Sequence, residues 1–336
     1  MKQFIVKLSF LLYLFACMVL LPLYGQDNAS QKQSPGLRAT HCLVYDNKNQ
    51  TVILLDGTYP AIQAASGFSE PWSWDGKNWK QISNSGPQAR YTNSTVYDSK
   101  RKRIISYGGR IGKSEIISNE LWEWDGMNWI KASDSTIGRR DHPMMAYDVE
   151  RGKTIVFGGG KYPRTKTWSQ DTWEWDGKKW ELAHTAGPLG RVGNMVYDKK
   201  NKLVILFGGV GEPLSPNGEQ PLYNDTWSWN GQVWNKLSDS GPPARSRFAM
   251  CYDDNLNAVV IYGGESMKQQ LSDMWKWDGK NWTEIKLHGM SPGKRSLHAM
   301  VYDTFRRKIV LYGGNCEGKV VADTWEWDGV EWKEIK

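Results

Sequence analysis

The sequence predicts an all-β fold made of six similar antiparallel sheets, and three observations support this prediction. Eighteen of the 19 tryptophans fall on one frame, Trp-x-Trp followed five residues later by a third tryptophan, and this frame occurs six times. Each copy also contains a Tyr-Asp pair, and successive pairs are 52, 50, 50, 55 and 50 residues apart. No sustained apolar spacing of helical length occurs between them. Self-similarity at this period means that one supersecondary unit has been copied.

Each copy opens with an arginine and continues with two predicted strands. The arginines are Arg38, Arg90, Arg139, Arg191, Arg245 and Arg295. The first strand ends at Tyr-Asp, a turn rich in Lys, Arg and Asn follows, and the second strand is an apolar run that ends in Gly-Gly. The first copy departs, because it has Asp56-Gly57 at this place. We assign the first glycine of each remaining pair to the scaffold: Gly108, Gly158, Gly208, Gly263 and Gly313.

The third and fourth strands carry the tryptophans. A loop of variable length leads to an acidic residue and then to Trp-x-Trp, whose two rings share one face of the strand and point at the same neighbouring sheet. Trp-Asp-Gly-x-x-Trp is a hairpin signal, because aspartate and glycine tolerate positive backbone angles. In the last copy we expect strands at 296–302, 308–313, 323–327 and 331–335. The second tryptophans assigned to the scaffold are Trp124, Trp175, Trp229, Trp277 and Trp327.

One copy should not fold alone. Three tryptophans of roughly 200 Å² each contribute, at about 25 cal/mol per Å², on the order of 15 kcal/mol, and ordering some fifty residues costs several times that. Packing six sheets around an axis buries both faces of each. We therefore predict a six-bladed β-propeller over residues 38–336, with blade 1 packed against blade 6 and no strand exchanged between the termini. The blades are expected at about 38–83, 90–132, 139–183, 191–237, 245–286 and 295–336.

These features resemble kelch repeats, in the diglycine that ends strand two, the aromatic residues of strand three and the tryptophan of strand four. The resemblance covers residues 38–336. The Trp-Asp-Gly form of strand three is similar to bacterial exported kelch proteins and to the central domain of galactose oxidase, more than to the animal adaptor proteins. Kelch propellers serve as enzymes, ligand binders and docking platforms, so the resemblance implies a fold and leaves function open.

Residues 1–25 resemble a secretory signal peptide, with two lysines followed by the apolar stretch 8–23. An uncleaved membrane anchor is the first alternative. A lipoprotein signal at Cys17 is the second, which the apolar residues after Cys17 disfavour. Residues 26–37 are expected to be a linker. We predict an exported protein, periplasmic, secreted or at the cell surface, with membrane contact only through an uncleaved N-terminal segment.

Charge and cysteine content exclude some classes of protein. The remaining cysteines, Cys42, Cys251 and Cys316, are odd in number and lack metal-like spacing, so neither a disulfide framework nor a Cys/His zinc site is expected. The formal charge of +7 becomes +5 when the two lysines of residues 1–25 are removed with no acidic residue. This charge is spread along the repeats, and nucleic-acid binding needs a concentrated basic face. We expect a monomer without a nucleic-acid partner.

The repeated arginines form a ring of six on the rim where the chain enters strand one. In kelch proteins that bind acidic ligands or peptides, the resemblance implies that arginines at this place can face a pocket at the mouth of the channel. Guanidinium groups suit bidentate recognition of carboxylates, so we treat all six as candidate ligand-binding residues. The alternative is that they pair with the repeated acidic residues, since a buried unpaired charge is costly.

One repeat position, three residues after the arginine, carries histidine in three blades and other residues in the rest: His41, Asn93, His142, Asn194, Phe248 and His298. Because asparagine and phenylalanine also occupy it and no carboxylate completes a site, we expect no metal there. Galactose oxidase holds copper with tyrosines, histidines and a cysteine cross-linked to tyrosine, and the chain does not show that constellation. We expect no cofactor.

Residues that the repeats do not share are candidate contact residues, because loops on a rigid scaffold carry function. They are Tyr162, Arg164 and Trp168 in blade 3 and Tyr223 in blade 4. The blade 4 loop spans 18 residues from the second glycine to the tryptophan pair, against 11 in blades 5 and 6. Exposed aromatic rings suit carbohydrate or peptide binding. The alternative for Trp168 is that it lies on its own blade.

No nucleophile elbow, phosphate-binding glycine loop or zinc-protease histidine pair occurs in the sequence, so catalytic residues stay unknown. We predict a non-enzymatic binding module for a glycan or protein partner. The alternative is a carbohydrate-active enzyme similar to sialic acid mutarotase, and a galactose oxidase-like oxidase ranks behind it. Isolated carboxylates or arginines with shifted pKa values at the channel mouth favour the enzyme.

Overall fold

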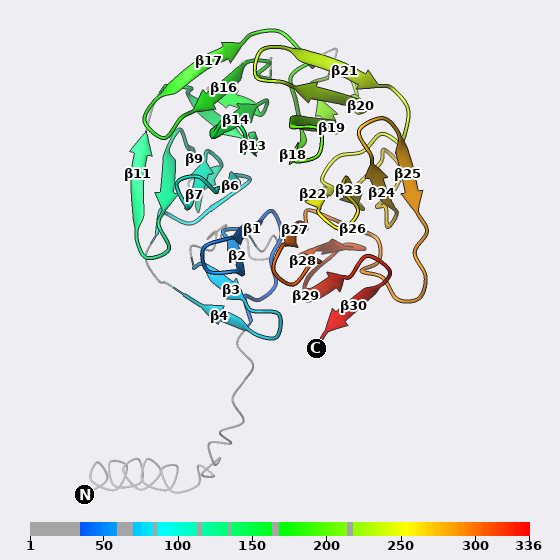
Figure 1. Ribbon diagram of the computed structural model, residues 1–336. Coiled ribbons are helices and arrows are strands. Elements are labelled where there is room, and N and C mark those ends of the chain that lie inside the picture. The colour runs from blue at the N-terminus through cyan, green and yellow to red at the C-terminus, as the bar shows by residue number, and fades with distance from the viewer. Residues whose placement is uncertain are drawn as a thin grey trace, which may run out of the picture. The chain divides into compact units, whose positions relative to one another are not determined.

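Six antiparallel meanders of four strands make up the part of the chain that the structure, a computed structural model, describes (Figure 1). The described residues are 34–58, 70–82, 86–112, 116–133, 136–162, 168–213 and 218–336. The predicted signal peptide, residues 26–33 and Arg164 lie outside these ranges. No helix within them is long and apolar enough to cross a membrane.

The first three blades contain the following strands. Blade 1 has β1 (Cys42–Asp46), β2 (Thr51–Leu55), β3 (Trp72–Trp74) and β4 (Trp79–Gln81). Blade 2 has β6 (Ser94–Asp98), β7 (Arg103–Tyr107), β10 (Leu121–Trp124) and β11 (Trp129–Ser133). Blade 3 has β13 (Met144–Asp148), β14 (Lys153–Phe157), β16 (Thr172–Trp175) and β17 (Trp180–His184). The order within each sheet is sequential, as a meander requires.

The last three blades follow the same plan. Blade 4 has β18 (Arg191–Asp198), β19 (Leu203–Gly211), β20 (Leu222–Trp229) and β21 (Trp234–Ser238). Blade 5 has β22 (Ala249–Asp253), β23 (Ala258–Tyr262), β24 (Met274–Trp277) and β25 (Trp282–Ile285). Blade 6 has β27 (Ala299–Asp303), β28 (Lys308–Cys316), β29 (Lys319–Trp327) and β30 (Trp332–Ile335). Short strands at the blade rims are β5 (Arg90–Tyr91), β8 (Arg110–Ile111), β9 (Ile116–Ile117), β12 (Arg139–Asp141), β15 (Gly160–Tyr162) and β26 (Arg295–Ser296).

The first strand of each blade lies at the centre, and neighbouring first strands contact one another in a closed cycle (Figure 1). β27 of blade 6 contacts β1 of blade 1, so the ring closes. The all-β propeller prediction is confirmed. Residues 34–37 form no strand with blade 6. One expected strand, 296–302, is broken at Leu297, because that residue adopts a left-handed φ of 58°.

Tryptophans fill the seams between blades. The second tryptophan of each pair is at most 3% exposed: Trp74, Trp124, Trp175, Trp229, Trp277 and Trp327. Trp229 of blade 4 packs with Met144 of blade 3. In the closing seam Trp74 packs with Tyr312 of blade 6 and donates an Nε1 hydrogen bond of 3.1 Å to Glu326. The rings thus face the preceding blade, and the closing seam uses the same kind of contact as the others.

The second glycine of each Gly-Gly pair donates a backbone hydrogen bond across the seam to the next blade. The N–H of Gly109 donates to the carbonyl of Arg140 in the next blade at 2.9 Å, and Gly314 donates to Arg38 at 3.0 Å across the closing seam. The preceding glycines have φ between 54° and 73°. A Cβ on any of them would lie 2.5–3.0 Å from a backbone carbonyl oxygen: Gly108, Gly158, Gly208, Gly263 and Gly313. Glycine is required because a backbone oxygen approaches so closely, from the next blade at four of these positions and from Tyr223 of the same blade at Gly208.

Candidate binding site at the mouth of the channel

The repeated arginines are buried, at most 1% exposed, and they serve the scaffold. They are Arg38, Arg90, Arg140, Arg191, Arg245 and Arg295. Each donates to the carbonyl that ends strand two of its own blade, as Arg295 Nη1 does to Gly313 at 3.1 Å. Five also pair with the repeated acidic residue of their blade: Arg90–Glu120, Arg140–Asp171, Arg191–Asp225, Arg245–Asp273 and Arg295–Asp323. The expectation that these arginines face a ligand is not met, and the pairing alternative explains them.

In blade 3 the buried arginine is Arg140, and the predicted Arg139 is exposed. Arg140 precedes the tyrosine of its strand by seven residues, as in blades 1, 2, 5 and 6, whereas Arg139 precedes it by eight. The prediction was wrong by one residue because two arginines are adjacent. The correction also moves His142, which lies two residues after the scaffold arginine. Pro143 takes the position that His41 has in blade 1.

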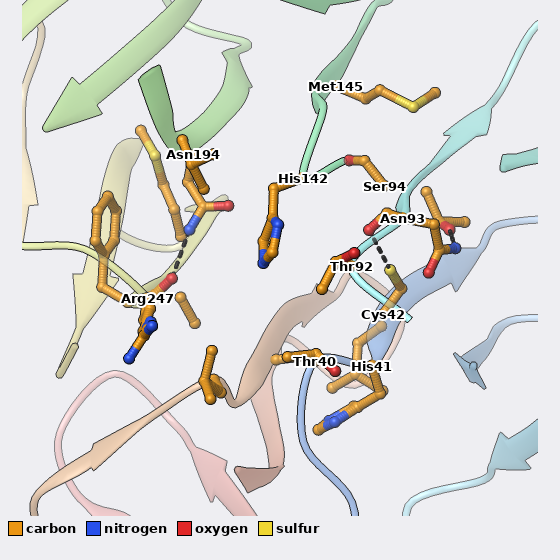
Figure 2. A pocket seen from close by; sticks show the side chains of 18 of the residues that line it. Thr40, His41, Cys42, Thr92, Asn93, Ser94, His142, Met145, Asn194 and Arg247 are labelled. Atoms are coloured by element: carbon orange, nitrogen blue, oxygen red, sulfur yellow. Dashed lines mark hydrogen bonds between the residues drawn. The ribbon is translucent and has the colours of Figure 1, made fainter. Parts of the chain in front are cut away.

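A cavity of about 230 Å³ lies at the starts of the six innermost strands. Each blade contributes lining residues from the segment between its scaffold arginine and its Tyr-Asp pair. Figure 2 shows the His142 ring projecting from the start of blade 3, with Asn194 and Arg247 on one side and Thr40 and Thr92 on the other. The polar groups at this opening therefore come from positions that differ between blades.

Five blades place a non-glycine residue in the left-handed region at this rim, two residues after the arginine, and we call these the mouth residues. Their φ values are 52–58°: Thr40, Thr92, His142, Arg247 and Leu297. Such angles are uncommon outside glycine, above all for threonine. The Thr40 N–H donates to Leu297 at 2.9 Å, Leu297 donates to Arg247 at 2.9 Å, and His142 donates to Thr92 at 3.0 Å. These hydrogen bonds between blades hold the strained backbone in place.

Blade 4 has no mouth residue. Arg191 precedes the tyrosine of its strand by six residues, one fewer than in the other blades. β18 therefore runs unbroken, with a register shift between Val192 and Asn194. Asn194 pairs with Phe207, and its place in the sheet is that of Ala249 in blade 5. The predicted equivalence of Asn194 with the histidine position is wrong, because one residue is missing before it.

On one side of the opening, Asp141 holds a cluster that joins blades 2 and 3. His142 Nδ1 lies 3.0 Å from Asp141 Oδ1, Thr92 donates to the same oxygen at 2.6 Å, and Arg110 donates to Oδ2 at 2.6 Å. Burial raises the pKa of Asp141, but the hydrogen bonds from His142, Arg110 and Thr92 outweigh it and hold the pKa well below its usual range. The carboxylate orients the His142 ring, whose Nε2 has no partner among the described residues.

On the other side, Arg247 belongs to a cluster of blades 5 and 6. Its Nη1 donates to Glu265 at 2.8 Å, and its side chain is 55% exposed. Glu265 also accepts a hydrogen bond from Ser296, to whose hydroxyl Gln270 donates at 3.0 Å. The guanidinium is thus positioned by a carboxylate and still open to solvent.

Beneath the cavity the departure of blade 1 from Gly-Gly creates a buried carboxyl. Asp56 is 6% exposed and accepts a hydrogen bond of 2.7 Å from Asn93. Burial raises the pKa of Asp56 to about 6, although Arg90, Asn93 and Arg38 act in the opposite direction. Burial also raises the pKa of Cys42 to about 12, so this pocket-lining thiol stays protonated at neutral pH.

The two remaining histidines of the predicted position are core residues. His41 and His298 are each 6% exposed, and His41 Nε2 lies 3.1 Å from the carbonyl of Tyr312. Burial lowers the pKa of His41 to about 3 and that of His298 well below its usual value. Within the described ranges no three His, Cys, Asp or Glu residues are grouped so that they could hold a metal ion. A copper centre of the galactose oxidase kind does not fit these residues.

Among the loop candidates, Trp168 and Tyr223 are not cavity-lining residues. Trp168 is half-buried, with its carbonyl against the backbone that leads to blade 4. The Tyr223 ring stacks on the guanidinium of Arg191, whose Cζ lies 3.9 Å from the ring centroid. Tyr162 is described only by its backbone pairing between β12 and β15. Of these candidates, Tyr223 thus packs its ring against the scaffold.

Comparison with known proteins relates the second half of the repeats to a family. The family model described as KLHDC2/KLHL20/DRC7 Kelch-repeats domain matches residues 196–336, most of blades 4 to 6. The same arginine, strand-end and tryptophan contacts recur in blades 1 to 3. The matched part of the chain is similar to kelch repeats. Kelch repeats generally mediate protein–protein binding. A search of curated proteins found no match. The bacterial exported type stays a prediction.

Sequence reasoning missed Asp141, Arg247 and the pairing role of His142. The signal that could have found them is the spacing from arginine to Tyr-Asp, which is seven residues in five blades and six in blade 4. Counting back from the tyrosine assigns Arg140 to the scaffold and Arg247 and His142 to one structural position. The oligomeric state stays a prediction.

Proposed function

We propose that this protein is an exported kelch propeller that holds a protein partner at the mouth of its central channel. The observation that carries the proposal is the cavity, whose rim gathers the polar side chains that the blades do not share, Arg247, His142 and Asn194. Arg247 and His142 belong to the two clusters on opposite sides of the opening. Arg247 presents an exposed guanidinium group, and His142 presents a ring nitrogen. Such groups suit an acidic or hydrogen-bonding side chain of the partner.

The proposed export rests on residues 1–25, and a glycan is the other ligand class for the same opening. The repeated arginines have no part in the proposal, since the scaffold uses them.

The test is capture of partners by the protein lacking residues 1–25, followed by comparison with variants. Arg247→Ala and His142→Ala should each weaken the captured complex about tenfold or more, as loss of a charged hydrogen bond does. Lys200→Ala is the matched control, because Lys200 is exposed in a turn at the other end of strand one. A complex that both mouth variants keep at full strength contradicts the proposal, and retention of a glycan in place of a protein changes its ligand class.

A second candidate is a carbohydrate-active enzyme of the epimerase type, and the Asp141–His142 pair favours it. A carboxylate that orients an imidazole is the usual support for proton transfer. Anomer exchange of sialic acid, followed by NMR, tests this candidate. Acceleration that His142→Gln abolishes and Lys200→Ala preserves supports an enzyme, and an unchanged spontaneous rate argues against it.

A further inference from the structure

The ring of mouth residues has one empty place, and its position is defined by the chain. Five blades supply a mouth residue. Blade 4 supplies none, because its arginine and its tyrosine are one residue closer together in the sequence and β18 continues without a break. In the intact parts of the ring, a backbone N–H of one blade donates to a carbonyl of the preceding blade. The gap therefore lies between His142 of blade 3 and Arg247 of blade 5.

Two backbone groups border the gap. Within the described residues, no hydrogen bond reaches the carbonyl of His142 or leaves the N–H of Arg247. Elsewhere in the ring the Thr92 carbonyl accepts from His142 and the Leu297 N–H donates to Arg247, whereas no backbone hydrogen bond joins the Thr92 N–H to the Thr40 carbonyl among the described residues. Blade 4 presents Gly193 here, with no side chain, and the amide of Asn194, whose oxygen faces His142 in Figure 2. The gap thus offers an acceptor on one side and a donor on the other.

We propose that this gap takes a secondary amide of the partner, namely one peptide bond of an extended segment. The inference rests on the proposed function and specifies what the opening recognises. The guest C=O accepts from the Arg247 N–H, and the guest N–H donates to the His142 carbonyl or to Asn194. The guest amide thereby pairs with both backbone groups that border the gap.

A peptide bond fits the gap better than a single polar atom does, because the ligand must supply a hydrogen-bond donor and a hydrogen-bond acceptor together. The surroundings agree with a peptide that carries an acidic neighbour, since the Arg247 guanidinium and the His142 ring flank the same gap. The amide is recognised by backbone atoms, so side-chain variants alone do not test it.

The sharpest test fills the gap with the chain's own residue. Insertion of one threonine between Val192 and Gly193 restores the seven-residue spacing of the other blades and supplies the missing mouth residue. The probe is a peptide selected from a random display library on the protein lacking residues 1–25. The insertion should weaken its binding at least tenfold with the thermal midpoint nearly unchanged. One threonine inserted between Lys200 and Asn201, in the distant turn, is the matched control and should leave binding intact.

A measurement on the peptide covers the case in which the insertion disturbs folding. N-methylation of each peptide bond in turn removes one N–H at a time, and one position should lose about tenfold in affinity while the others change little. Uniform tolerance of N-methylation overturns the inference, as does full binding to the folded insertion variant. Selection of no peptide, with binding of N-acetylglucosamine and not glucosamine, overturns it in favour of a sugar amide, and selection of none of these overturns it outright.

The two proposals fail in different ways. If Arg247→Ala weakens the peptide and the insertion does not, the mouth holds a partner but not through the blade 4 gap. If neither change affects binding, the partner sits elsewhere and both proposals are wrong.

Discussion

Two positions of the repeat, only two residues apart, behave in opposite ways. At the arginine position Arg245 is fully buried and paired with Asp273, and the same contact recurs around the ring. At the mouth position Arg247 is 55% exposed, and its counterparts are threonine, histidine and leucine. A residue that holds each blade together must repeat because every blade needs the same contact. The cavity exists once and is shared by all blades, so its residues are free to differ.

The largest expected effect tests the scaffold side with two adjacent residues. Arg140→Ala should lower the free energy of unfolding by about 3–5 kcal/mol, because it leaves Asp171 and the Gly158 carbonyl without their buried partner. Arg139→Ala, at an exposed site, should cost less than about 1 kcal/mol. Urea unfolding of both variants measures the difference. Equal losses would mean that burial does not separate the two arginines.

The next effect concerns Asp56, which departs from the repeat and yet is buried. Because its folded-state pKa is raised to about 6, its contribution to stability is present below about pH 4 and is lost as pH rises through 6. Asp56→Asn should therefore gain up to about 2–3 kcal/mol relative to the native chain between pH 4 and 8. Urea unfolding across that range checks this, with exposed Glu219→Gln as control. Parallel curves for native chain and Asp56→Asn would contradict the assignment.

A smaller effect is expected at the cluster that orients His142. Asp141→Asn should cost about 1–3 kcal/mol at pH 7, because Arg110 loses a charged partner. The pKa of Asp141 is held below its usual value, so its contribution is present above about pH 4 and is lost as pH falls further. The stability difference between native chain and variant should therefore shrink steadily as pH falls below about 4. A difference that stays constant between pH 7 and pH 3 would point to packing in place of charge.

The smallest effect on stability belongs to the mouth itself. His142→Ala and Arg247→Ala should each change the free energy of unfolding by less than about 1 kcal/mol, since both side chains are partly solvated. Thermal unfolding measures this while a partner assay measures binding. A large loss of stability in either variant would assign these residues to the scaffold and remove the contrast between the two positions.

Much of the fold was predictable because the seams are local patterns copied around the ring. Trp229 and Trp74 pack on the preceding blade as the strand periodicity indicates, and the diglycines mark strand ends. The break at Leu297 was not predicted, since it depends on a hydrogen bond to Arg247, fifty residues earlier in the chain. A contact of that kind leaves no signal within a single repeat.

The candidate site was less predictable. The arginines were identified as functional candidates and are scaffold, because the same charge can face a pocket or a neighbouring acid and only burial distinguishes these outcomes. Asp141 was not predicted as a site residue, because its partners Thr92 and Arg110 belong to another blade. The aromatic loop candidates drew attention by their chemistry, yet Tyr223 stacks on Arg191.

The amino-acid sequence by itself determined the repeat, the strand order and the residues that fill each seam, because these contacts recur at fixed spacing and need no knowledge of the whole. The tertiary structure decided which of two adjacent arginines is buried, which side chains surround the cavity and where the mouth ring is open. These depend on one-residue differences in register between blades, and hydrogen bonding at the channel mouth brings such differences together from segments far apart in the chain.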